Sequence, residues 1–171
     1  MGHVVKVISG GQTGVDRAAL DAALKAGVPV GGWVPRGGWA EDMTRPPGLL
    51  ARYPTLQETA SDDIRERTRR NVQDASATLI LPAPTPGRDR GTWLTLRTAQ
   101  RLGRPCLAAS LDDPQPVLDW LGKLPGNIIL NVAGPRESHH PGIYRQTHNF
   151  LDKLLPQAAA KPASEPSHRL L

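Results

Sequence analysis

The chain has 171 residues, of which 39% are hydrophobic and only 4% aromatic, and its formal net charge is +5 at pH 7. This length suits one domain that buries about 70% of the surface of the unfolded chain around an aliphatic core. A single cysteine excludes an internal disulfide and any zinc site built from several cysteines, and no apolar run approaches the roughly 20 residues of a membrane span.

The first residues read directly as a strand and lack the long apolar stretch of a signal peptide, so we expect a cytoplasmic protein without a membrane partner. Short apolar runs and amphipathic segments then alternate along the chain. The runs that predict strands are 4–8, 29–34, 77–81, 105–109 and 127–133. The segments with apolar residues at helical spacing are 15–26, 61–74, 91–102, 117–124 and 143–155.

This alternation predicts an α/β fold. Because each strand is a continuous apolar run, we expect a mainly parallel sheet of five or more strands with helices on both faces, a three-layer sandwich. We assign residues 1–156 to one ligand-binding domain, within which 35–60 is irregular and rich in glycine and proline. Residues 157–171 have no periodicity, so we expect a mobile C-terminal tail.

Right-handed crossovers place the carboxyl ends of all strands at one edge of such a sheet, where ligands bind. The first loop at this edge combines Gly10, Gly11, Gln12, Thr13 and Gly14 directly before a helix. Glycines allow close approach of a bound group, and a helix N-terminus favours a phosphate. The alternative is that these glycines only form a tight turn. The loop matches neither the P-loop nor the dinucleotide fingerprint.

Two residues at the start of the following helix have different expected roles. The spacing of Thr13 and Asp16 fits a capping box, which makes Asp16 a helix cap rather than an acid catalyst. Arg17 has no such structural reason and is a candidate ligand-binding residue. His139 and His140 are adjacent, and no cysteine stands at ligand spacing from a histidine, so we expect no metal site.

Basic residues recur in the other loops at the same edge. The candidates there are Arg36, Arg88, Arg90, Arg136, Ser138, Gly91 and Thr92. Each arginine alone could be an ordinary surface residue, but their concentration at one edge predicts an anionic ligand. Trp33, Trp39 and Trp93 lie in or beside these loops, where they could stack on a flat ligand or pack a loop onto the domain.

Several segments together resemble a known family. They are Ser-Gly-Gly-Gln-Thr-Gly-Val-Asp-Arg (9–17), Gly-Gly-Trp-Val-Pro-Arg-Gly (31–37), Ala-Glu-Asp (40–42), Arg-Thr-Arg-Arg-Asn-Val (67–72), Gly-Thr (91–92) and Leu-Asn-Val-Ala-Gly-Pro-Arg-Glu-Ser (130–138). Over about residues 4–155 the chain resembles the molybdenum-cofactor carrier family, a circularly permuted branch of the lysine-decarboxylase-like, Rossmann-type nucleotide-ligand sensor superfamily. The resemblance implies a Rossmann-like sheet, a homo-oligomer such as a dimer or tetramer, and a nucleotide or molybdopterin ligand.

One departure from this superfamily bears on activity. Its phosphoribohydrolases carry Pro-Gly-Gly-x-Gly-Thr-x-x-Glu with a catalytic glutamate, whereas Gly91-Thr92-Trp93-Leu94 is followed here by Thr95. A threonine cannot supply a carboxylate. We therefore expect a binding protein, a carrier or sensor. The alternative is a nucleotide N-glycosidase that uses another carboxylate, with Glu58 as the candidate and Glu41 as a further one. A nucleic-acid-binding protein, suggested by the charged segment 65–70, is the least favoured interpretation.

Overall fold

Five short strands form one parallel sheet in the computed structural model, which describes residues 1–85 and 89–159. Their order is β2-β1-β7-β5-β6, and every neighbouring pair is parallel. The strands are β1 (His3–Ile8), β2 (Val30–Gly31), β5 (Ala77–Ile80), β6 (Cys106–Ala108) and β7 (Asn127–Ala133). The prediction of a Rossmann-like α/β fold is therefore confirmed.

Strand β7 lies at the centre of the sheet, where the strand order reverses. The chain passes from β1 outward to β2 on one side and from β5 outward to β6 on the other. Leu130 of β7 is fully buried and lies beside Val7 of β1 and Ala77 of β5. Such a switch point leaves a crevice at the carboxyl ends of the central strands, which is where the candidate site is found.

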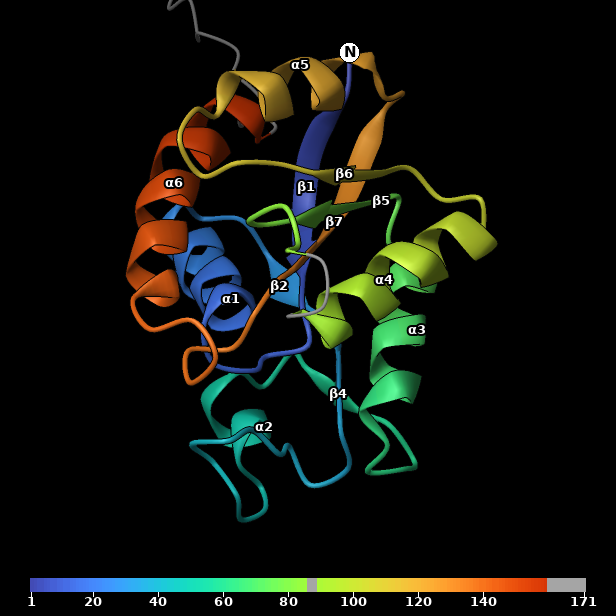
Figure 1. Ribbon diagram of the computed structural model, residues 1–171, viewed down its shortest axis with the longest axis vertical. Coiled ribbons are helices and arrows are strands. Elements are labelled where there is room, and N and C mark those ends of the chain that lie inside the picture. Colours follow the sequence, from blue (N-terminus) through green and yellow to red (C-terminus); the bar gives the residue numbers. More distant parts are fainter. Residues whose placement is uncertain (86–88, 160–171) are drawn as a thin grey trace, which may run out of the picture.

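Helices cover both faces of this sheet (Figure 1). On one side lie α1 (Val15–Lys25) and α6 (Ile143–Ala158), with α5 (Gln115–Lys123) packed against α6. On the other side lie α3 (Ile64–Asp74) and α4 (Arg90–Arg101). Leu20 of α1 and Leu154 of α6 are completely buried, so the layer between these helices and the sheet is aliphatic, as the composition requires.

The single strand predicted over residues 29–34 is wrong, because the chain leaves the main sheet at Gly32. Residues before it form β2, whereas β3 (Trp33–Val34) pairs with β4 (Gln57–Glu58) in a separate two-stranded sheet. Gly32 has a φ of +125°, and a Cβ there would lie 2.4 Å from the carbonyl oxygen of Ser9. Only glycine permits this turn.

The irregular segment 35–60 contains two short elements, β4 and the single-turn helix α2 (Leu49–Arg52), which Figure 1 shows beyond the end of β2. Leu49 is fully buried and fastens this segment to the core. Ala40 and Met43 exchange backbone hydrogen bonds of 3.1 and 3.0 Å. This tight turn leaves Glu41 and Asp42 at its tip, next to the loop that follows β1.

The predicted helix ends that differ most from the observed ones are the start of α3 and the end of α6. Helix α3 begins after Asp63, whose carboxylate accepts a hydrogen bond from the Arg65 amide at 2.9 Å, and not at Ser61. Helix α6 continues past Pro156 to Ala158, because Ala158 is 5% exposed and packs in the core. Residues 160–171 of the predicted tail lie outside the described residues, so the boundary at 156 stays a prediction.

Within the described ranges, no helix combines the length and hydropathy needed to cross a membrane.

Candidate functional site

A cleft of about 340 Å³ opens at the carboxyl ends of β1 and β7, between α1, α3 and the start of α4. Gly10, from the loop after β1, and Gly134, from the loop after β7, both line it. The two loops therefore share one edge of the sheet, as predicted. The ionisable residues that line the cleft are Asp16, Arg67, Asp89, Arg90, Arg136 and His139.

Arg67 of α3 is the arginine that the structure places most firmly in this cleft. Its side chain is only 12% exposed. The Nη1 atom donates to the carbonyl oxygen of Gly10 at 2.8 Å and lies 3.3 Å from Oδ2 of Asp16. The buried Nε atom has no hydrogen-bond partner among the described residues. A buried cationic donor without an acceptor is costly, so this atom is suited to meet an acceptor from a bound molecule.

From sequence, the arginines of this helix served only as an argument for a nucleic-acid partner, and Arg67 was not identified as a site residue. A signal was present in the spacing. Asn71 lies four residues further on, which places it on the same face of the helix, and it is 3% exposed. Its side chain accepts a hydrogen bond from the Trp33 amide and donates one to the Trp33 carbonyl oxygen. The polar pair Arg67 and Asn71 thus marks the inward face of α3.

Gly10 permits the close approach of this arginine. A Cβ at Gly10 would lie 1.8 Å from Nη1 of Arg67 and 3.0 Å from Oδ2 of Asp16. Contacts under 3 Å do not occur between real atoms of this kind, so any side chain here would push the guanidinium away. Gly10 in the predicted phosphate-binding loop therefore allows the arginine to approach as well as the chain to turn.

The capping box predicted for Thr13 and Asp16 is wrong. The N-cap of α1 is Gly14, and no side chain caps this helix end. The Asp16 carboxylate instead pairs with Arg67 at the cleft, where Asp16 is 6% exposed. Burial raises the pKa of Asp16 above its ordinary value, although the charge of Arg67 opposes that rise. A carboxylate therefore lies beside the glycine loop, where a cap had been expected.

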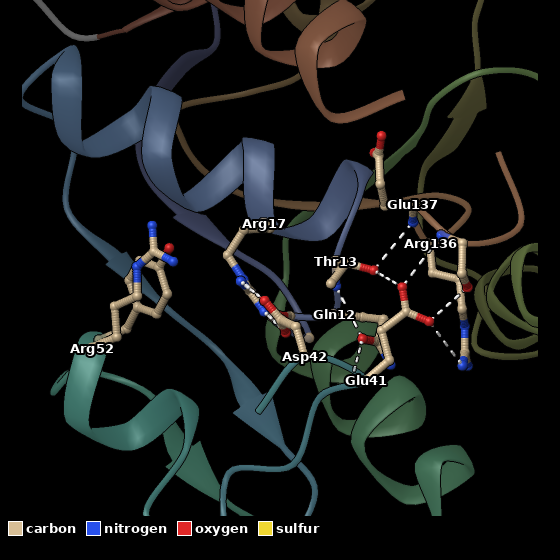
Figure 2. Close-up of polar contacts among 12 residues, drawn as sticks. Gln12, Thr13, Arg17, Glu41, Asp42, Arg52, Arg136 and Glu137 are labelled. Atoms are coloured by element: carbon tan, nitrogen blue, oxygen red, sulfur yellow. Dashed lines mark hydrogen bonds and ion pairs between the residues drawn. The ribbon is translucent and has the colours of Figure 1, made fainter. Parts of the chain in front are cut away.

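Arg17 holds the same loop from its other side (Figure 2). Its two terminal nitrogens each donate to a different oxygen of Asp42 at 2.9 Å, and its Nε donates to the carbonyl oxygen of Gly11 at 3.1 Å. Arg17 is 5% exposed. Burial disfavours its charge, but the hydrogen bonds to Asp42 and the nearby negative charges together outweigh burial and raise the pKa of Arg17. The pair fixes the turn at residues 40–43 against the loop that follows β1.

Glu41, at the tip of that turn, accepts hydrogen bonds from two loops (Figure 2). The hydroxyl of Thr13 donates to its carboxylate, and so do the hydroxyl of Ser138 at 2.6 Å and the amide of Ser138 at 3.3 Å. The Arg136 Nη1 atom lies 3.7 Å away. Burial opposes the charge, but the bonds from Ser138 and Thr13 hold the pKa of Glu41 below its ordinary value.

Of the residues predicted to bind the ligand, six line the cleft: Gly10, Gln12, Arg90, Gly91, Thr92 and Arg136. Thr95 also lines it, and its hydroxyl donates to the carbonyl oxygen of Gly91 at 3.2 Å. No tryptophan is among the described residues that line the cleft. The Trp33 ring instead stacks with Arg70, whose Cζ atom lies 4.6 Å from the ring centre.

Of the other predicted residues, those that the structure describes do not line this cleft. Arg36 is exposed on the loop after β3, and Glu58 of β4 accepts a hydrogen bond from the Gly37 amide at 2.7 Å. Neither residue lines the cleft. Arg88 lies outside the described residues, and Gly11 contributes its carbonyl oxygen to Arg17. Their roles in binding stay predictions.

A second hollow, of about 370 Å³, lies on the far side of the glycine loop, where Thr13, Gly14 and Arg17 form part of its lining. Asp21 lies at its wall and accepts hydrogen bonds from the hydroxyls of Tyr53 and Tyr144. Burial and the bond to Asp21 raise the pKa of Tyr144 to about 12. The carboxylate of Asp21 is thus satisfied within the protein. Among the described residues no cluster of histidine, cysteine, aspartate or glutamate could hold a metal ion.

Comparisons with known proteins place the chain in a family and agree with its fold. Residues 7–155 match the model of the circularly permutated YpsA SLOG family. The chain is also similar to the crystal structure of the "Putative molybdenum carrier protein" from Syntrophus aciditrophicus SB, with 37% sequence identity and a TM-score of 0.77. That similarity covers 90% of this chain and 95% of the other. Among curated proteins there is no significant match.

Proposed function

Because the chain belongs to the circularly permutated YpsA SLOG family, we propose that it is a carrier or sensor that binds an anionic ligand in the cleft. The ligand class is a phosphate monoester joined to a heterocycle, which includes nucleotides and molybdopterin. The name of the Syntrophus protein supports the pterin form of this ligand. The binding function itself rests on the charges and the shape of the cleft.

The observation that carries the proposal is the buried Arg67 guanidinium at the glycine loop. Its Nε lacks an acceptor among the described residues, and its Nη1 is held by Gly10 and Asp16. A phosphate oxygen would supply the missing acceptor in a charge-assisted hydrogen bond. Arg90 and Arg136 line the same cleft. The first turn of α1, from which Asp16 lines the cleft, adds the positive end of a helix dipole.

The rest of the ligand has an aliphatic surface available to it. Ile64 of α3, Leu94 of α4 and Pro135 line the cleft. Ile64 is 39% exposed, which is unusual for a large apolar side chain. A flat ring that covers it would remove apolar surface from water. The cleft therefore offers a charged part for phosphate and an apolar part for a heterocycle.

The contacts of α3 favour a small ligand over a nucleic acid. Arg65 pairs with Asp63, and Arg70 pairs with Glu66 while it stacks on a tryptophan ring. Together with Arg67, three of the four arginines of this helix pair with a carboxylate of the chain. A basic face for a phosphate backbone needs cations that are free of such partners.

Native mass spectrometry of the full chain tests this proposal. The purified protein is exposed to adenosine 5′-monophosphate, to a pterin phosphate, and to adenosine as the control that lacks a phosphate. We expect a one-to-one adduct with a phosphate-bearing compound and none with adenosine. Equal retention of adenosine, or no adduct with either phosphate compound, would contradict an anion-binding cleft.

A nucleotide N-glycosidase is a second candidate, because Asp16 brings a carboxylate into the cleft beside the glycine loop. Hydrolysis of a glycosidic bond needs such a group to activate water or to stabilise a cationic sugar. Base release from nucleoside monophosphates over hours, with Asp16→Asn and Glu58→Gln in parallel, separates the possibilities. Turnover lost only in Asp16→Asn would establish the enzyme, provided that this variant still binds the nucleotide. No release by the unaltered chain would exclude it.

A further inference from the structure

The surroundings of the Glu41 carboxylate are those of a bound oxyanion (Figure 2). It receives hydrogen bonds from the hydroxyl of Thr13 and from both the hydroxyl and the amide of Ser138, and the Arg136 guanidinium lies 3.7 Å away. Hydroxyls, a backbone amide and an arginine are the donors with which proteins hold phosphate oxygens. We call these groups of Thr13, Arg136 and Ser138 the oxyanion cradle.

The cradle and the group that fills it come from different parts of the fold. Thr13 follows β1, and the other two cradle residues follow β7, so the main sheet positions all the donors. Arg136 also lines the cleft, which makes the cradle continuous with it. Glu41 comes instead from the turn between β3 and α2, outside the main sheet. The cradle donors therefore belong to the edge of the main sheet where the cleft opens. The acceptor, Glu41, comes from a separate segment.

Glu41 can leave the cradle without unfolding this turn. The neighbouring Asp42 is held by both terminal nitrogens of Arg17, and the backbone amide of Glu41 donates to the Gln12 side chain at 3.0 Å. The backbone of the tip is thus fixed independently of the Glu41 carboxylate. That carboxylate belongs to a side chain that is 22% exposed, so a rotation about its own bonds would return it to water.

We infer that the cradle is an oxyanion subsite, that Glu41 occupies it in the ligand-free protein, and that the phosphate of an entering ligand displaces Glu41. This inference rests on the proposed function, because it concerns the phosphate of the same class of ligand. A phosphate dianion brings more charge to Arg136 and more acceptor oxygens than a carboxylate does. Glu41 is tethered at high effective concentration, so its competition lowers the apparent affinity for the ligand.

Calorimetric titration of the full chain with adenosine 5′-monophosphate tests the competition. Glu41→Gln weakens the internal competitor, because the side chain loses its charge. Glu41→Asp keeps the charge but shortens the side chain by one methylene, so the carboxylate no longer fills the cradle. We expect both variants to bind more tightly, Glu41→Gln by about tenfold, which is roughly the loss of one charge-assisted hydrogen bond. Tighter binding by Glu41→Gln alone would be a general charge effect and would overturn the inference.

A double variant locates the gain. If the phosphate enters the cradle, Ser138→Ala added to Glu41→Gln should remove most of the tenfold gain, because the phosphate loses the hydroxyl of Ser138. A gain that persists in the double variant places the phosphate elsewhere. Weaker or unchanged binding by both single Glu41 variants makes Glu41 a structural clamp and likewise overturns the inference.

Inorganic phosphate separates this inference from the proposed function. Phosphorus NMR line broadening reports whether Glu41→Gln binds phosphate more tightly than the unaltered chain does. Such binding in a protein that retains neither the nucleotide nor the pterin phosphate would leave the subsite standing while the proposed function fails. If the unaltered chain binds the nucleotide and the Glu41 variants do not change its affinity, the proposed function stands and the inference about the cradle fails.

Discussion

The Asp16 carboxylate and the Arg67 guanidinium lie 3.3 Å apart across the loop that follows β1. Asp16 belongs to α1 and Arg67 to α3, which cover opposite faces of the sheet (Figure 1). The pair therefore joins the two outer layers at the edge where the cleft opens. The pair also orients the Arg67 guanidinium. This group is therefore already positioned and largely desolvated when a ligand enters the cleft.

The fit of this arginine over Gly10 predicts opposite effects for two glycine substitutions. Gly10→Ala puts a Cβ 1.8 Å from Nη1 of Arg67, and overpacking of this kind costs roughly 1 to 3 kcal/mol. Gly122→Ala lies in α5, where a Cβ would meet nothing within 4 Å, so it should stabilise by about 0.5 to 1 kcal/mol. Urea denaturation measures both, and equal effects would contradict the close approach.

The ion pair of Arg17 should contribute more to stability than a matched surface pair. Arg17→Met removes a side chain that is 5% exposed and bonded to Asp42 and Gly11. We expect a loss of about 2 kcal/mol or more in the free energy of unfolding. Arg65→Met breaks the pair with Asp63, in which the arginine side chain is 76% exposed, and should leave the free energy of unfolding nearly unchanged, because solvent screens such a pair. Similar losses for both variants would argue against a structural role for Arg17.

The carboxylates of the turn predict a loss of stability in acid. In the folded protein the hydrogen bonds from Arg17 hold the pKa of Asp42 below its ordinary value of 3.8, and the pKa of Glu41 lies below 4.5. The folded state therefore binds fewer protons than the unfolded chain as the pH falls. This stabilisation is complete above the unfolded pKa values and is lost as the pH falls through the lowered ones.

Denaturation of the unaltered chain and of Asp42→Asn at pH 7 and pH 3 measures this effect. The unaltered chain should lose more of its free energy of unfolding between the two pH values than Asp42→Asn does, because the variant has one fewer carboxylate with a lowered pKa. An identical loss in both proteins would mean that Asp42 is not stabilised by its partner.

A buried hydroxyl in α6 predicts that removing a polar group is tolerated. Thr147 is completely buried, and its Oγ1 has no hydrogen-bond partner among the described residues. Thr147→Val replaces this atom by a methyl group of similar size, so the melting temperature should stay unchanged or rise. Thr147→Ala is the control, since the small cavity it leaves should lower the melting temperature. A lower value for Thr147→Val would show that the hydroxyl has a partner.

The fold could be predicted from sequence because its signals are local. The continuous apolar run 127–133 coincides with β7, and alternation with helices specifies a parallel sheet. The departure at Gly32 could not be predicted in this way. It depends on the close approach of Gly32 to Ser9, and the apolar pattern runs on without a break across that position.

Part of the site could also be predicted from local signals. Glycine-containing loops that follow strands indicate the edge of the sheet where a ligand binds, and this identified Gly10 and Arg136, which line the cleft. Arg67 was missed because the apolar stripe of its helix is thin and most other positions are charged or polar, so the apolar pattern does not show which arginine faces inward. The partners of Glu41 could not be paired from spacing either, since Ser138 is 97 residues away along the chain. Such contacts follow only from the packing of loops from different layers.

The most direct measurement of an anion-binding cleft is a calorimetric titration of adenosine 5′-monophosphate into Arg67→Ala and Arg69→Ala. The two variants remove the same charge from the same helix, but only Arg67 lines the cleft, while the Arg69 side chain is exposed. We predict that Arg67→Ala weakens binding by at least about tenfold, the loss of one charge-assisted hydrogen bond, and that Arg69→Ala stays within about threefold. Equal weakening in both folded variants, or unchanged affinity in Arg67→Ala, would contradict a ligand held at this cleft.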